Sequence, residues 1–238
     1  MKRFFNSGVG IIMILILVSN FVSGGLSNPG EYIYHILIML PGIIIGLSFH
    51  EFAHGYVSYK LGDPTPKYQG RLTLNPKAHF DPFGFLALVF MGFGWGIPVE
   101  INPSYYKNKR RDELLVAFAG VTMNLVIAII TAFVVKIILY SNPYITDDSI
   151  MSIVISILMG VVSVNIILLV FNLIPIPPLD GFNVITQIFN LRGTKFYYTV
   201  YKNGFLILLV LLLVGVVDKV IGPAYYFIYS LIVNNIIL

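Results

Sequence analysis

Residues 32–59 of the chain read YIYHILIMLPGIIIGLSFHEFAHGYVSY, and this stretch decides how the rest of the sequence is interpreted. The apolar run is long enough to cross the hydrocarbon core of a bilayer, which takes about 20 helical residues. Its second half nevertheless contains His50, Glu51 and His54. Ionisable side chains are costly inside a membrane and mark functional sites there, so the stretch predicts a membrane helix that carries such a site.

The three ionisable residues form the pattern His-Glu-x-x-His. On a helix, residues four positions apart are offset by about 40° and about 6 Å along the axis, so both imidazoles lie on one face. They could bind one zinc ion at about 2.0–2.1 Å each. Glu51 is turned by about 100° from His50 and is placed to take a proton from the attacking water rather than to bind metal. A buried polar cluster that only packs helices is the alternative interpretation.

The composition of the whole chain is typical of a membrane protein. Its 238 residues are 57% hydrophobic and 11% charged, whereas a soluble domain carries about 25% charged residues. The absence of cysteine excludes disulfides and thiol catalysis. Further apolar runs occupy residues 8–26, 114–140, 150–171 and 204–238. The last run is long enough for two spans with a turn near Gly222-Pro223, so about six transmembrane helices are expected.

Basic residues between the apolar runs predict the orientation of the spans, because Lys and Arg accumulate in cytoplasmic loops. Lys2 and Arg3 precede the first run, which predicts a cytoplasmic N-terminus. The loops after the second and fourth runs are also basic, with Lys60, Lys67, Arg71, Lys77, Arg192, Lys195 and Lys202. Counting about 1.5 Å per residue back from Lys60 places His50 and His54 about 15 and 9 Å below the cytoplasmic face.

The first apolar run has two interpretations. Its basic start, apolar core and the small residues Ser23-Gly24-Gly25 also fit a secretory signal peptide. The length of the run, at the upper end for a signal-peptide core, favours a retained span. Cleavage would leave the topology of the other spans unchanged.

Residues 83–98 break the simple succession of spans. They are apolar and short, contain four glycines and have basic residues on both sides. We therefore expect a re-entrant or interfacial segment. Residues 71–75 and 99–102 alternate apolar and polar side chains and end at Asn-Pro, which predicts two short strands beside that segment. Such strands would offer an edge to an extended substrate.

The expected fold is an all-α polytopic membrane protein with about six transmembrane helices and a short re-entrant or β-hairpin element. We expect one membrane-embedded domain over residues 1–238, without an appended soluble module. Its core would cover residues 32–190, flanked by spans at 8–26 and 204–238.

A catalytic zinc ion takes three protein ligands and leaves a fourth position open. Asp180 is the favoured third ligand, because it stands in the segment Asn172-Leu-Ile-Pro-Ile-Pro-Pro-Leu-Asp-Gly181, whose prolines must break a membrane helix. A broken helix at membrane depth needs a polar cavity. His79 is an alternative ligand, whereas His35 lies four turns before His50 and cannot reach. A proline kink without a ligand is the other interpretation.

These residues together resemble the site-2 proteases, a family of intramembrane zinc metalloproteases. The resemblance covers residues 43–184. Besides the two metal motifs, it includes Gly70-Arg-Leu-Thr-Leu-Asn-Pro76, Asp81-Pro-Phe-Gly84, Gly94-Trp-Gly96, Pro98, Ala119-Gly120 and Asn124. The family often has Gly-Pro where this chain has Gly120-Val121, and Lys where it has Ile97. The resemblance is to a compact form without the PDZ or CBS modules that some relatives carry.

The resemblance implies one zinc ion held by His50, His54 and Asp180, with Glu51 activating water. It also implies that the substrate is a membrane protein with a transmembrane segment, such as an anti-sigma factor or a remnant signal peptide, cut in a bacterial-type cell membrane. Asn124 and Asn172 are polar residues in apolar spans. Either could line the water path or stabilise the oxyanion, or could form an interhelical hydrogen bond instead.

Two other functions compete with proteolysis. A metal or proton transporter could use the same polar residues as a relay, but it should show an inverted repeat and polar residues through the full membrane depth. Neither is found in the sequence. An inactive membrane scaffold would not require Glu51. Nothing in the sequence indicates a nucleic-acid partner; the expected partners are the lipid bilayer and a membrane-protein substrate.

Overall fold

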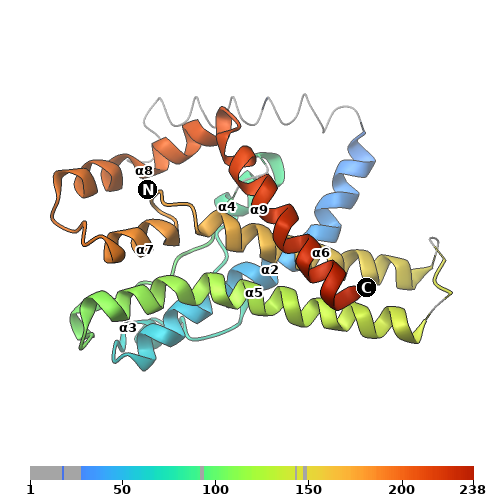
Figure 1. Cartoon of the computed structure of the whole chain (residues 1–238), viewed down its shortest axis with the longest axis horizontal. Helices are drawn as coiled ribbons and strands as arrows, with labels where there is room; N and C mark the ends of the chain where they lie inside the picture. The colour runs from blue at the N-terminus through green and yellow to red at the C-terminus, as the bar shows by residue number, and fades with distance from the viewer. Residues whose placement is uncertain (1–17, 19–27, 92–93, 143, 147–148) are drawn as a thin grey trace.

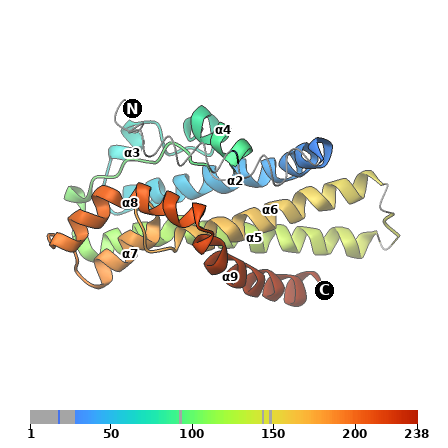
Figure 2. The same cartoon turned by 90° about the horizontal axis from the view of Figure 1, so that it is seen from above.

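The computed structural model describes residues 18, 28–91, 94–142, 144–146 and 149–238, and every regular element within them is a helix. Two long helices, α5 (Lys109–Ser141) and α6 (Ile150–Asn172), run side by side, and α2 (Pro29–Lys60) packs against both (Figures 1 and 2). The helices α7 (Asp180–Ile188), α8 (Lys195–Leu213) and α9 (Val216–Ile232) follow, and a π-helical turn, η4 (Val233–Ile237), continues α9.

Short elements connect α2 to α5. They are α3 (Thr65–Tyr68), the 3₁₀ turn η2 (Pro76–Ala78), α4 (Pro82–Met91) and the 3₁₀ turn η3 (Pro103–Tyr105). At about 1.5 Å per residue, α4 is about 15 Å long and cannot cross a core of about 30 Å. This length agrees with the expectation that residues 83–98 do not span the membrane.

Five helices in the described part of the chain are long and apolar enough to cross a membrane: α2, α5, α6, α8, and α9 together with η4. The predicted all-α polytopic fold is therefore confirmed. The sixth expected span, residues 8–26, lies outside the described residues except for Val18.

The turn within the last apolar region was predicted at the wrong position. It lies at Gly215, between α8 and α9, whereas Gly222 and Pro223 lie inside α9. Gly215 has a φ of 70°, a left-handed conformation that glycine adopts without steric cost. Pro223 does not end the helix, because membrane helices tolerate proline where neighbouring groups satisfy the freed carbonyl.

The two predicted strands are also wrong: residues 71–75 and 99–102 have no strand structure. A ladder needs backbone N–H groups that face a partner strand. Here the N–H of Val99 donates to the carboxylate of Glu51 at 2.8 Å, and that of Asn102 donates to another buried carboxylate at 2.7 Å. Side-chain acceptors thus take the hydrogen bonds that strand pairing would have used.

Close helix packing fixes the position of α2. A Cβ atom on Gly42 would lie 2.9 Å from the Cα of Val161, and one on Gly160 would lie 2.9 Å from the carbonyl oxygen of Ile38. Small residues at these positions let the backbones of α2 and α6 approach each other, as is common between membrane helices. The close approach leaves no room for α2 to shift relative to α6.

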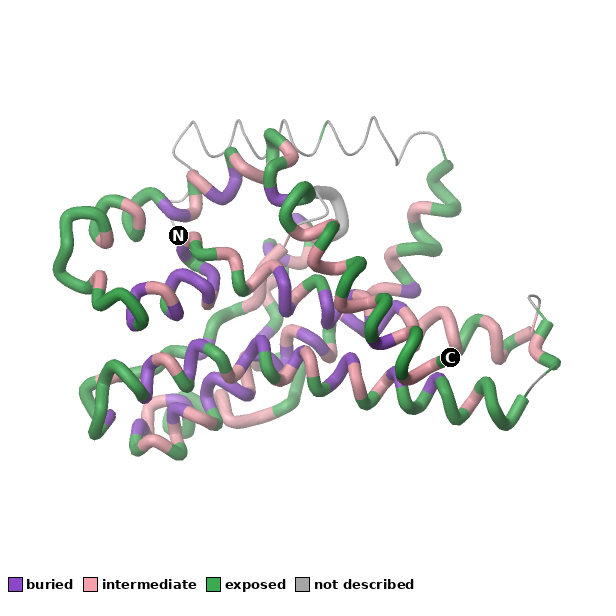
Figure 3. The backbone as a smooth tube through the Cα atoms, in the orientation of Figure 1, coloured by how far each residue is buried: buried purple, intermediate pink, exposed green. Residues whose placement is uncertain are grey.

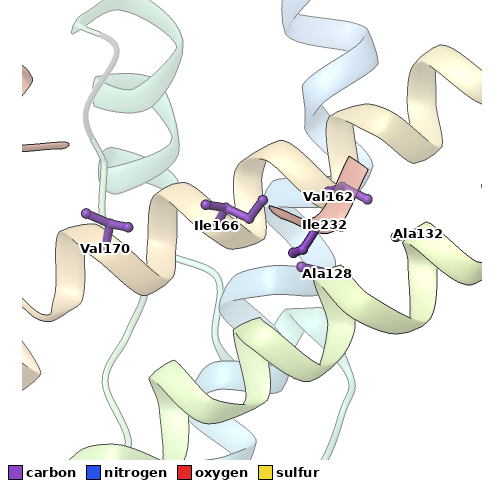
Figure 4. Close-up of a cluster of buried hydrophobic side chains, with 6 residues drawn as sticks. All are labelled: Ala128, Ala132, Val162, Ile166, Val170 and Ile232. Carbon is purple, nitrogen blue, oxygen red and sulfur yellow. The ribbon is translucent and has the colours of Figure 1, made fainter. Parts of the chain in front are cut away.

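A buried apolar cluster joins α5, α6 and α9 (Figure 4). Its members are Ala128, Ala132, Val162, Ile166, Val170 and Ile232. Buried residues are concentrated where the long helices meet, while the outer surfaces of the helices are largely exposed (Figure 3). The exposed face of α5 includes Ile130, Phe133 and Ile137, which suits a surface that contacts lipid.

Candidate metal centre

The metal motif lies on α2, which is one uninterrupted helix through both histidines. The Nε2 atoms of His50 and His54 are 3.0 Å apart, and both residues are buried. Both rings turn toward α5, where the Nδ1 atom of His50 contacts Asn124 and that of His54 contacts the carbonyl oxygen of Val116. The one-turn spacing thus places the two imidazoles side by side, as the sequence predicts.

Asp180 reaches the same point from a different part of the chain. α6 ends at Asn172, and residues 173–179 form a non-helical segment with three prolines before α7 begins at Asp180. The Oδ2 atom of Asp180 lies 3.2 Å from the Nε2 atom of His50 and 3.2 Å from that of His54. These three side chains form a group that could hold a metal ion.

The other two histidines do not belong to this group. The Nε2 atom of His79 lies 2.9 Å from the carbonyl oxygen of Thr73, in the loop after α3. His35 is exposed and lies 3.8 Å from Glu31, one turn away on α2. The structure therefore gives no support to His79 as the third ligand.

The chemistry of the three ligand atoms fits a cation. The Nδ1 atoms of His50 and His54 each lie 2.7 Å from an oxygen that can only accept, so each Nδ1 carries the proton and each Nε2 presents a lone pair. The Oδ2 atom of Asp180 is buried and has no hydrogen-bond donor. Three lone pairs facing one another in a buried site repel unless a positive charge lies between them.

The spacing of the ligand atoms also fits zinc. Tetrahedral zinc with bonds of about 2.0–2.1 Å holds its ligand atoms about 3.3–3.4 Å apart. The observed separations are 3.0, 3.2 and 3.2 Å. Two imidazoles and one carboxylate are the ligand set of many catalytic zinc sites, which leave the fourth position to water or substrate.

Gly120 of α5 provides the space for this site. A Cβ atom there would lie 2.4 Å from the Nε2 atom of His54 and 2.6 Å from that of His50. A side chain at this position would therefore enter the volume that the two ligand nitrogens face. Gly120 belongs to the Ala119-Gly120 pair in the family resemblance, but the sequence does not reveal this contact, which depends on how α2 packs against α5.

Glu51 lies beside the ligand group without belonging to it. It is half-buried, and its Oε2 atom accepts a hydrogen bond from the backbone N–H of Val99 at 2.8 Å. The carboxylate is thereby directed toward the extended segment 94–102. This segment contains exposed Ile97 and Ile101.

The two asparagines singled out from the sequence have different surroundings. Asn124 is completely buried and contacts His50, the carbonyl oxygen of Gly46 and the side chain of Asn165. Asn172 is half-buried at the end of α6 and donates to the carbonyl oxygen of Leu168 at 3.0 Å. Asn165 is a residue that sequence reasoning missed, although a polar residue within an apolar span was the available signal.

Membrane-spanning helices and a buried His-His-Asp group that fits zinc define the class of intramembrane zinc metalloproteases. The model of Peptidase family M50 matches residues 134–215, which include Asp180. No solved structure matches the chain significantly.

Two relatives extend the comparison over most of the chain. "Putative zinc metalloprotease YwhC" of Bacillus subtilis is 36% identical over 204 residues, covering 81% of this chain and 90% of the relative. "Putative zinc metalloprotease Rip2" of Mycolicibacterium smegmatis is 25% identical over 219 residues, covering 87% of this chain and 82% of the relative. The chain belongs to peptidase family M50, the site-2 proteases.

Proposed function

We propose that His50, His54 and Asp180 hold the catalytic zinc ion and that Glu51 is the general base of peptide hydrolysis. The observation that carries this proposal is the triangle of two Nε2 atoms and one Oδ2 atom, with sides of 3.0, 3.2 and 3.2 Å. A zinc ion held there supplies Lewis-acid polarisation of the scissile carbonyl and makes water a better nucleophile near neutral pH.

Glu51 is positioned for proton transfer by its backbone partner. The N–H of Val99 occupies Oε2, and this leaves Oε1 of the carboxylate to accept the proton of the attacking water. The same carboxyl group then delivers the proton to the leaving amine. The hydrogen bond from Val99 restricts rotation of the side chain during both transfers.

The asparagines take separate roles in this proposal. Asn124 holds the ring of His50 through Nδ1 and so orients a ligand. Asn172 donates one amide hydrogen to Leu168 and keeps a second for the developing oxyanion. Asn172 is the last residue of α6, immediately before the segment that leads to Asp180.

We further propose that the substrate is a transmembrane segment of another membrane protein, such as an anti-sigma factor or a remnant signal peptide. The depth of the site supports this substrate class, because His50 and His54 lie ten and six residues before Lys60 on a continuous helix. That spacing corresponds to about 15 and 9 Å from the end of the span. The basic loops support an orientation with the N-terminus and the site on the cytoplasmic side of a bacterial-type membrane.

Both relatives are named as zinc metalloproteases, which favours proteolysis over transport. The test compares the purified wild type, Glu51→Gln and Glu100→Gln in detergent. Glu100 is an exposed carboxylate in the segment that Glu51 faces, so it is a matched control. Bound zinc is measured by elemental analysis, and cleavage is measured on a model single-span substrate.

We expect all three proteins to hold one zinc ion and only Glu51→Gln to lose cleavage. Cleavage by Glu51→Gln at the wild-type rate would show that Glu51 is not the general base. A wild-type protein that binds no zinc would contradict the assignment of the ligands.

A further inference from the structure

α7, the helix that begins with Asp180, ends among charged side chains of α5 that the proposed mechanism does not use. The guanidinium of Arg110 donates to the backbone carbonyl oxygens of Gln187 and Ile188, both at 2.6 Å. These carbonyls belong to the last turn of α7, where no further helical N–H is available to them. Arg110 therefore attaches the C-terminal end of α7 to the first turn of α5.

A buried carboxylate makes a second attachment at the same place. Glu113 of α5 is almost fully buried, and its oxygens receive two bonds from Arg192, at 2.6 and 2.5 Å. Gln187 of α7 donates to the same carboxylate at 2.5 Å. Arg192 lies four residues after the end of α7, so Glu113 binds both the last turn of α7 and the connection that follows it.

α7 is not a continuation of α6: its first turn packs closely on the preceding segment at Gly181, and the position of its far end depends on its own contacts. It has nine residues, and an isolated helix of that length is marginal in water. The proline-containing segment 173–179 separates α7 from α6. The two helices therefore share no continuous helical hydrogen bonding, and the position of α6 does not determine that of α7.

α5 contacts the other ligands as well. Its residues Val116 and Asn124 bind the Nδ1 atoms of the two histidines. The same helix therefore contacts the histidine pair about two and four turns after its start, and contacts the far end of α7 through Arg110 and Glu113 near its start. Because Asp180 is the first residue of α7, a displacement of that helix would also displace Asp180 relative to the histidines.

We propose that Arg110, Glu113 and Arg192 are positioning residues that set Asp180 against His50 and His54, through α7. This inference rests on the proposed role of Asp180 as a zinc ligand. It predicts that loosening the far end of α7, eight residues from the ligand, weakens zinc binding in the folded protein.

The test uses full-length protein in detergent and measures zinc affinity by competition with a chelator, well below the unfolding temperature. The variants are Arg110→Met and Arg192→Met, with Arg192→Lys as the conservative replacement. Arg111→Met is the matched control, because Arg111 is an exposed neighbour on α5 that pairs with Asp112 rather than with α7. Arg110→Met breaks no ion pair among the described residues and is therefore the primary variant, whereas Arg192→Met and Glu113→Gln both break the buried Arg192–Glu113 pair and are compared only at temperatures where thermal unfolding shows them to be folded.

We expect Arg110→Met and Arg192→Met to weaken zinc binding about tenfold, the lower end of the effects seen for partners of metal ligands. Arg192→Lys should recover part of the loss, and Arg111→Met should stay within about twofold of the wild type. With Co²⁺ in place of zinc, the visible absorption bands should shift in the two Met variants, because a carboxylate ligand has moved.

A merely structural role for the cluster would lower the unfolding temperature and leave the zinc affinity and the Co²⁺ spectrum unchanged, and this result would overturn the proposal. Asp180→Asn separates the two hypotheses. If Asp180→Asn binds zinc as tightly as the wild type, the ligand assignment fails. If it loses zinc while both Met variants bind normally, the positioning role alone fails.

Discussion

The Oδ1 atom of Asn124 lies 2.7 Å from the Nδ1 atom of His50, and this contact is the middle of a buried hydrogen-bond chain. The amide nitrogen of Asn124 donates to Asn165 at 2.9 Å and to the carbonyl oxygen of Gly46 at 3.2 Å. Because these two acceptors fix which way the amide faces, its oxygen must face the histidine. The chain thus connects α2, α5 and α6 and determines which ring nitrogen of His50 faces Asp180 and His54.

Replacement of Asn124 by leucine should therefore weaken zinc binding about 10- to 100-fold, because Nδ1 of His50 would lose its acceptor. Asn165→Leu should have a smaller effect, because Asn165 binds Asn124 and not the ring of His50 itself. The zinc affinities of both purified variants are measured by competition with a chelator. Asn142→Leu, at the exposed end of the same helix, is the control. Wild-type affinity in Asn124→Leu would contradict the orienting role.

Gly120→Ala should abolish stoichiometric zinc binding while leaving the helical fold intact. The added Cβ would lie 2.4 Å from a ligand nitrogen, whereas alanine is about 1 kcal/mol better than glycine within a helix. Zinc content and circular dichroism together distinguish these effects. Thr122→Ala, at an exposed position two residues later, should change neither. Normal zinc content in Gly120→Ala would show that the side chain can be accommodated.

Asp63, a completely buried residue just after α2, should stabilise the loops around the site in a pH-dependent manner. It accepts hydrogen bonds from Ser58, the N–H of Thr65 and the N–H of Asn102, at 2.7–2.9 Å. Burial raises the pKa of Asp63, but these hydrogen bonds outweigh burial and hold the pKa below the ordinary value of 3.8.

Since the pKa of Asp63 is lower in the folded than in the unfolded state, its contribution is complete above about pH 5 and is lost as the pH falls below 3.8. Asp63→Asn should lower the free energy of unfolding by about 2 kcal/mol at pH 7, because an amide would replace a charged acceptor. Thermal unfolding at both pH values measures the effect: the unfolding temperature of Asp63→Asn should lie closer to that of the wild type at pH 3 than at pH 7. If the two proteins differed by the same amount at both pH values, ionisation of Asp63 would not be the cause. Glu100→Gln serves as the control, because it removes an exposed carboxylate.

The natural absence of cysteine allows the proposed orientation to be tested directly with single-cysteine variants. Lys60→Cys would lie at the exposed end of α2, and Tyr144→Cys would lie in the exposed connection between α5 and α6. In intact spheroplasts, a membrane-impermeant maleimide should label Tyr144→Cys and should label Lys60→Cys only after permeabilisation. The reverse pattern would invert the assigned topology.

The parts of the site that follow from local rules could be predicted from the sequence. The histidine spacing places two rings on one helical face, and the prolines end α6 before Asp180. The structure brings these three side chains together. Gly120 and Asn165 could not be assigned in this way, because their contacts depend on the packing of α2 against α5 and α6, which no short pattern encodes.

The errors in the predicted fold have a related cause. The alternating pattern of residues 99–102 favours a strand only if its N–H groups remain free for pairing. Glu51 and a buried aspartate, distant in the sequence, take those groups instead. Likewise Gly215 and the Gly222-Pro223 pair are both plausible turn signals, and the structure has its left-handed turn residue at Gly215 while Gly222 and Pro223 stay helical.

The break between α6 and α7 also affects the order in which the enzyme is made. Asp180 is synthesised more than a hundred positions after His54. At translation rates of about 5–20 residues per second, the histidines enter the membrane on the order of ten seconds before the carboxylate that joins them. If the three residues are the zinc ligands as proposed, the nascent chain carries an incomplete ligand set throughout the insertion of α5 and α6. On the proposed ligand assignment, each copy of the protease becomes competent only after the segment around Asp180 has left the ribosome.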